Sequence, residues 1–165
     1  MSAKHAILLG ACVFPMMAVH AQDSKIGFVS TERIFREAAP AKTAQAKIEQ
    51  EFSRRDKDLQ DMGARLKSMS DKLDKDAAIL SESDRAKRQR EVADLDKEFQ
   101  RKQREFREDL NQRRNEELAI VLERTNKVIK QIAETEKYDI VFQEAVFASP
   151  RIDITDKVLK ALNGK

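Results

Sequence analysis

The sequence has almost none of the residues on which most catalytic and metal sites depend. It contains one cysteine, Cys12, and two histidines, His5 and His20, and all three lie within the first 21 residues. The rest of the chain therefore offers no thiol nucleophile, no disulfide framework and no histidine–cysteine set for zinc. No glycine-rich phosphate loop is present either, so we expect neither enzymatic activity nor a cofactor.

Proline and glycine, which interrupt helices, are also scarce. The segment Thr43–Lys137 contains no proline and a single glycine, Gly63, and it therefore predicts nearly continuous helix. Its apolar residues recur mostly at steps of three and four, which is typical of a helix packed against another helix. They are Ile48, Phe52, Leu59, Met62, Leu66, Met69 and Leu73, then Val92, Leu95, Phe99, Phe106 and Leu110, and finally Leu118, Leu122, Ile129 and Ile132.

A turn is expected inside this segment, near residues 81–84. Serine and aspartate favour helix ends, and Ser81 followed by Asp84 resembles a capping box. We therefore expect an antiparallel helical hairpin over residues 43–136, built from helices Thr43–Leu80 and Asp84–Glu136. The fold class is mainly α, with this long coiled-coil hairpin as an arm.

The expected arm is not uniform. Arg55 and Asp76 stand where the apolar seam would continue, and we expect the arm to bend at these polar seam positions and at Gly63. Pro40 is expected to kink a longer first leg that begins at Thr31, because proline removes a helical hydrogen bond.

Residues 1–21 have the pattern of a cleaved signal peptide. A short basic start precedes an apolar run, and Val19–Ala21 is a suitable cleavage site, so we expect export to the periplasm. A membrane-spanning helix needs about 20 apolar residues, more than this run has. A lipoprotein site at Leu9–Cys12 is the weaker alternative, because it would leave almost no apolar core before it.

The segments that flank the hairpin, residues 22–42 and 137–165, must meet in space. Lys25–Val29 and Tyr138–Phe142 are strand-like, Ala145–Phe147 is a second short strand candidate, and Thr155–Asn163 predicts a final helix. A body this small is marginal alone, so we expect self-association. Its expected core and oligomerisation residues are Ile26, Phe28, Val29, Ile140, Phe142, Val146, Ile152 and Ile154.

Charged residues make up 37% of the chain and the net charge is only +3, so acids and bases are mixed along the predicted helices. One basic cluster follows the turn: Arg85, Lys87, Arg88 and Arg90. It fits a solvated helix end, or a tip that meets lipopolysaccharide or an anionic membrane surface. Nucleic acid is a weaker candidate partner, because no base-reading motif or stacking aromatic accompanies the cluster.

Short motifs mark both ends of the mature sequence. At the start they are Lys25–Val29, Arg33–Phe35 and Pro40–Lys42, which leads into Ile48–Phe52; at the end they are Tyr138–Phe142, Ala145–Val146, Ile152–Asp156, Val158–Leu159 and Leu162–Asn163. These motifs resemble those of the Skp/OmpH family of periplasmic chaperones. The resemblance implies a homotrimer whose helical arms enclose a cavity for unfolded outer membrane proteins, without ATP. It also implies lipopolysaccharide binding on the arms, for which local charge alone suggests the basic cluster.

Apolar side chains among the arm charges are candidate client contacts. These are Phe52, Met62, Met69, Phe99 and Phe106, and the alternative is that they hold the two helices together. For the whole protein, the alternative to a chaperone is a structural coiled-coil scaffold or spacer of the envelope, with a more continuous seam and no clients.

Overall fold

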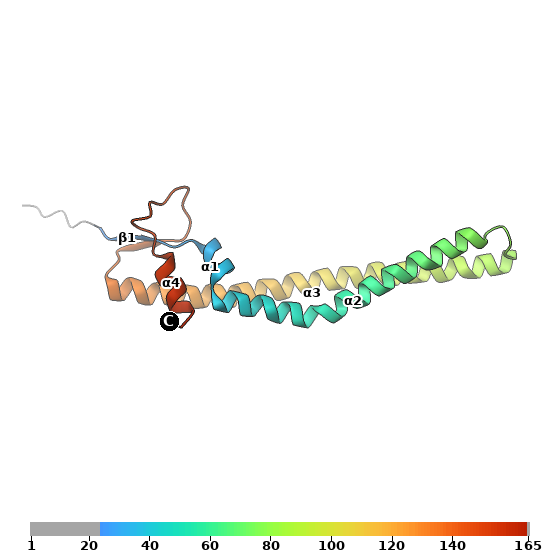
Figure 1. Cartoon of the computed structure of the whole chain (residues 1–165), viewed down its shortest axis with the longest axis horizontal. Helices are drawn as coiled ribbons and strands as arrows, with labels where there is room; N and C mark the ends of the chain where they lie inside the picture. The colour runs from blue at the N-terminus through green and yellow to red at the C-terminus, as the bar shows by residue number, and fades with distance from the viewer. Residues whose placement is uncertain (1–23, 165) are drawn as a thin grey trace, which may run out of the picture.

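The computed structural model describes residues 24–164 and consists of a small body with one long arm (Figure 1). The elements are β1 (Ile26–Phe28), α1 (Thr31–Glu37), α2 (Ala39–Asp76), α3 (Glu82–Glu136), β2 (Ile140–Phe142) and α4 (Thr155–Leu162). Helices α2 and α3 run side by side as an antiparallel hairpin that projects from the body. The predicted fold class is confirmed, whereas the predicted signal peptide lies outside the described residues.

The arm begins with a helix break rather than a kink. Ala38 is buried and extended between α1 and α2, and Pro40 lies in the first turn of α2. The prediction that Pro40 kinks one long helix is wrong, because proline fits a helix start, where its missing N–H has no role. The side chain of Asn163, just beyond α4, accepts a hydrogen bond from the Ala39 N–H at 2.7 Å. The chain's C-terminal segment thus caps the first helix of the arm.

The turn of the hairpin occupies Ala77–Ser81, so α2 ends four residues before the predicted Leu80. Ser81 is extended, and its hydroxyl accepts from the Asp84 N–H at 3.1 Å and lies 2.6 Å from the Asp84 carboxylate. The predicted N-cap at Ser81 is confirmed, and the Asp84 carboxylate accepts from the Ser81 hydroxyl, not from the backbone N–H as in a capping box. Because Ser81 must leave the helical conformation to cap α3, the residues before it form the connection instead of more helix.

In the body, β1 is the central strand. It pairs in parallel with β2, in the register Ile26↔Ile140 to Phe28↔Phe142. On its other side, Phe28 bridges Asp153 through hydrogen bonds to Ile152 and Ile154. The predicted second strand, Ala145–Phe147, is wrong: this segment is a loop with Val146 and Phe147 exposed. The pairing beside β1 is made by the chain just after Pro150 instead.

The core of the body lies where α1, α3 and α4 meet the strands. Val29, Ile34 and Val158 are fully buried, and α3 contributes Val121 and Ile129 to the same cluster. The second arm helix therefore continues into the body and anchors the arm there. Within residues 24–164, no helix has both the length and the apolar content that a membrane crossing requires.

Candidate functional site

The two arm helices are joined by ion pairs at positions where the sequence interrupts the apolar seam. Arg55 on α2 contacts Asp109 on α3 at 2.8 Å, and Asp76 contacts Arg88 at 2.7 Å. The interruptions at Arg55 and Asp76 are thus cross-helix contacts. All four side chains are between about a third and a half exposed, so each pair contributes at most about 1 kcal/mol. They select the helix register more than they stabilise it.

An aromatic pair lies beside the first of these ion pairs. Phe52 and Phe106 meet edge to face with ring centroids 5.6 Å apart, and the Arg55 guanidinium lies 5.5 Å and 5.8 Å from the two rings. Phe52 is only 5% exposed. In this conformation Phe52 packs between the helices, which is the alternative given for the candidate client contacts, and it also lines the groove near the body, so its role as a client contact stays a prediction.

Arg113 is a second point of attachment between the helices. It contacts Glu51 on α2 at 3.2 Å and, on its own helix, Glu116 at 2.5 Å and the buried Glu117 at 2.8 Å. Hydrogen bonds from Arg113 and then Gln112 lower the pKa of Glu116 below its usual range. The buried carboxylate of Glu117 has Arg113 as its charged partner, and a buried acid requires such a partner.

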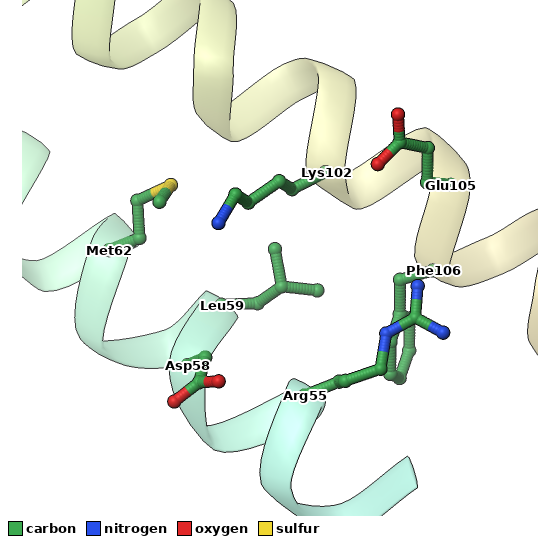
Figure 2. Close-up of a pocket in the computed structure, with 7 residues that line it drawn as sticks. All are labelled: Arg55, Asp58, Leu59, Met62, Lys102, Glu105 and Phe106. Atoms are coloured by element: carbon green, nitrogen blue, oxygen red, sulfur yellow. The ribbon is translucent and has the colours of Figure 1, made fainter.

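The remaining predicted contact residues are partly exposed. Phe99 packs over Gly63, where an added Cβ would lie 3.6 Å from the ring. Met62 lines a small cavity between the helices together with Phe106 (Figure 2). Met69 is half-buried nearer the tip. For Met62, Met69, Phe99 and Phe106, the role of client contact stays a prediction.

Between these attachments the hairpin is open. A groove of about 760 Å³ lies near the body, lined mainly by apolar side chains of both helices, and one of about 750 Å³ lies around Gly63. The broken apolar seam of the sequence corresponds to these gaps. The arm is therefore a hairpin with accessible apolar surface along its length rather than a closely packed coiled coil.

The predicted basic cluster lies at the start of α3, beside the turn. Arg85, Lys87 and Arg90 are exposed, whereas Arg88 is half-buried and pairs with Asp76. The sequence does not distinguish the exposed bases from the paired one. Only the position of α2 shows that Arg88 is the base that contacts the other helix of the hairpin. An anion-binding role for the cluster stays a prediction.

Exposed apolar side chains gather on the body and on the adjoining part of α3. Of the predicted body residues, Val29 and Ile154 are buried, Phe28 and Ile152 are half-buried, and Ile26, Ile140, Phe142 and Val146 are exposed. Phe147, Leu118, Ile120 and Leu122 are also exposed. Sequence reasoning assigned Leu118 and Leu122 to the helix seam, although the irregular step from Leu110 to Leu118 already indicated a change of face.

The described part of the chain has no cluster of three or more His, Cys, Asp or Glu side chains placed to hold a metal ion. Its acids instead pair with neighbouring bases on exposed helix faces, as the mixed charge pattern predicts. What the structure offers is extended, partly apolar surface on a projecting arm. Such a molecule belongs to the class of proteins that project a long helical hairpin from a small body (Figure 1).

Comparisons with known proteins identify the family. Residues 25–162 match the family model described as "Outer membrane protein (OmpH-like)". Chaperone protein Skp of Yersinia enterocolitica is 33% identical over 84% of this chain and 86% of its own length. Chaperone protein Skp of Photorhabdus luminescens is 35% identical over 82% of this chain and 84% of its own length. The chain belongs to the Skp/OmpH chaperone family, which confirms the resemblance seen at its two ends.

A solved structure shares the fold. A putative outer membrane chaperone (OmpH-like) from Caulobacter crescentus aligns with a TM-score of 0.70, over 99% of this chain and 89% of the other. The two sequences are 17% identical. The body-and-arm architecture is thus found in a distant sequence.

Proposed function

We propose that this protein is an ATP-independent periplasmic holdase chaperone that binds unfolded outer membrane proteins and keeps them soluble for membrane insertion. The observation that carries the proposal is the open arm, in which apolar grooves of about 750 Å³ each lie among mixed charges. Unfolded β-barrel chains carry alternating apolar residues that need shielding until a bilayer is available. Many weak apolar contacts on a soluble, charged arm meet that need. Membership of a family of chaperones supports the same function.

The working form that we propose is a homotrimer whose arms enclose a shared cavity. In the described residues, β2 pairs along one edge only, with β1, and Ile140 and Phe142 on it are about half exposed. Val146 and Phe147, in the loop that follows β2 in the chain, are almost fully exposed. An unpaired strand edge next to exposed apolar side chains is a surface that association would cover. The number three comes from the family resemblance.

We further propose that Arg85, Lys87 and Arg90 at the arm tip interact with lipopolysaccharide or an anionic membrane surface. The three bases are exposed and lie close together in sequence after the turn. The turn itself carries an exposed apolar side chain, Ile79, which is 83% exposed. Basic residues near an anionic lipid surface contribute about 1 kcal/mol each. Arg88 is excluded from this proposal because its guanidinium is paired with Asp76.

Light scattering tests the holdase proposal directly. An unfolded β-barrel protein is diluted from urea into buffer with or without the chaperone, and no nucleotide is added. The proposal expects the client to stay soluble only when the chaperone is present. If the client aggregates as fast as in buffer, the protein is better explained as an envelope scaffold or spacer without client binding.

A matched pair of variants tests the trimer. Phe147 in the body and Ile79 at the tip are 82% and 83% exposed, so Phe147→Ser and Ile79→Ser remove equally exposed apolar groups. We expect Phe147→Ser to shift the mass measured by size-exclusion light scattering from three protomers toward one, and Ile79→Ser to leave it unchanged. Equal masses for both variants and the parent would argue against an interface that contains Phe147.

A further inference from the structure

The small cavity in the middle of the arm has the size of a single aromatic ring. It has a volume of about 180 Å³ and lies between α2 and α3, with Leu59, Met62 and Phe106 as its apolar lining (Figure 2). An apolar protein cavity of about 150 Å³ holds one benzene molecule. The cavity is therefore large enough for one ring and too small for a segment of folded chain.

Its lining has the chemistry that favours a ring. The Met62 thioether makes favourable contacts with ring edges. Phe106, whose ring meets Phe52 edge to face and has the Arg55 guanidinium 5.8 Å from its centroid, adds an aromatic side chain to the lining. These contacts act on any aromatic side chain.

A cation lies at the mouth of the cavity. The Lys102 side chain reaches from α3 toward Met62, as Figure 2 shows. Its ammonium group is 3.8 Å from Glu98, a loose ion pair that leaves it able to approach a ring face. Arg55 also lines the cavity, but its guanidinium is held by Asp109. Because a ring face is electronegative, Lys102 is complementary in charge to an aromatic side chain and gains nothing from an aliphatic one.

The remaining lining groups are acceptors. The carboxylates of Asp58 and Glu105 belong to the same cavity. The Glu105 carboxylate already accepts a hydrogen bond from Arg101 at 2.6 Å, and a carboxylate has further acceptor positions for a phenol hydroxyl or an indole N–H. Tyrosine and tryptophan, which form the aromatic girdles of outer-membrane barrels, present such a donor on an apolar ring.

From this geometry we infer that the mid-arm cavity is a subsite that receives one aromatic side chain, tyrosine or tryptophan, of a bound client chain. The inference rests on the proposed function for the identity of the client. It adds to that function a preference: the arm selects unfolded chains by their aromatic residues and not by apolar character alone.

Side-chain analogues test the cavity without a client. Phenol and cyclohexanol have nearly the same size and each carries one hydroxyl, but only phenol has a ring face. Met62 and Met69 are the only methionines beyond residue 21, so the exported protein labelled with ¹³C-methyl methionine reports on the cavity and on an internal control. Met62→Leu assigns the two signals. We expect a saturable shift of the Met62 signal with phenol, a two- to fivefold weaker affinity for cyclohexanol, and no saturable shift at Met69.

A matched lysine pair tests the cation. Lys102→Gln removes the charge, keeps much of the side-chain length and adds no methionine signal, and Lys97→Gln makes the same change at an exposed position of the same helix that does not line the cavity. Lys102→Gln is expected to weaken phenol binding two- to fivefold and to leave cyclohexanol binding unchanged. Lys97→Gln is expected to change neither. Equal affinities for the two alcohols in the parent protein, or no saturation at Met62, would overturn the inference.

A peptide pair connects the cavity to clients. One unfolded β-barrel segment is used with its native tyrosines and tryptophans, and another with leucine in their place. Only the first should shift Met62 to saturation, and phenol should compete with it. If phenol shifts Met62 and the aromatic peptide does not, the assignment of the cavity to clients is refuted. If the peptide shifts Met62 but whole clients still aggregate, the holdase proposal fails while the subsite stands.

Discussion

Replacing Gly63 with alanine should stabilise the arm, although Gly63 is one of the positions at which the sequence predicts bending. Gly63 lies within α2, where glycine costs about 1 kcal/mol relative to alanine. A Cβ at this position would lie 3.6 Å from Cε2 and Cζ of Phe99, which is ordinary van der Waals contact. No backbone strain opposes the change, because the residue has helical geometry. The expected gain is therefore about 0.5–1 kcal/mol.

Amide hydrogen exchange gives the sharpest measurement, because it reports on the arm separately from the body. A gain of this size slows exchange of arm amides around residue 63 about two- to fivefold, provided that they exchange by local opening. Ala64→Gly is the matched control, since Ala64 is the next residue of the same helix and is exposed. It should speed exchange by a similar factor.

Faster exchange in Gly63→Ala would refute this reasoning. It would mean that the Phe99 ring cannot accept a methyl group at 3.6 Å, and hence that the helices pack more closely at this point than their separation indicates. Unchanged exchange in both variants would mean that these amides exchange through fluctuations that leave the helix intact at residue 63, so that neither substitution changes the opening equilibrium.

Two further predictions concern the contacts between the arm and the body. Asn163→Ala removes the cap on α2, which should lower the stability by about 0.5–2 kcal/mol and speed amide exchange in the first turn of α2. Asn163→Asp keeps an acceptor oxygen and should retain most of the protection against exchange. Stability should also fall in acid: hydrogen bonding from Lys157, with a smaller effect of Lys25, lowers the pKa of Glu136. The stability from this carboxylate is complete above the unfolded-state pKa of about 4.3 and is lost as the pH falls through the lower folded-state pKa. Urea midpoints between pH 7 and 3 should therefore fall less steeply at the acid end in Lys157→Met, and parallel curves would contradict this assignment.

The hairpin could be predicted because its signals are local. The scarcity of glycine and proline sets the helix length, the three–four spacing sets the face, and Ser81 with Asp84 sets the start of α3. The end of α2 was predicted four residues too late. Pro40 was predicted to kink a long helix, whereas it lies in the first turn of α2. The end of α2 depends on Ser81, which leaves the helix to cap α3, and the start of α2 depends on the cap that Asn163 provides. Helix propensity alone does not fix such boundaries.

The subsites of the arm could be predicted only in part. Spacing placed Phe52, Met62 and Phe106 on the inner face of the hairpin, but not which of them is buried by its neighbours. Phe52 is buried because Phe106 and Arg55 cover it, and both come from positions that sequence reasoning treated separately. Likewise Val146 was expected in a strand because apolar residues in a short run favour one, yet here it is exposed on a loop.

The sequence by itself determined the class of architecture, the family and the absence of histidine and cysteine beyond residue 21, because these depend on composition, periodicity and short terminal motifs. Only the tertiary structure decided which charged residues pair across the hairpin, where the apolar grooves lie and which aromatic side chains pack between the two helices. These features depend on the angle and separation of two helices whose facing residues lie dozens of positions apart, such as Glu51 and Arg113. A pairwise geometry of that kind is set by the packing of the whole molecule, and no local stretch of sequence encodes it.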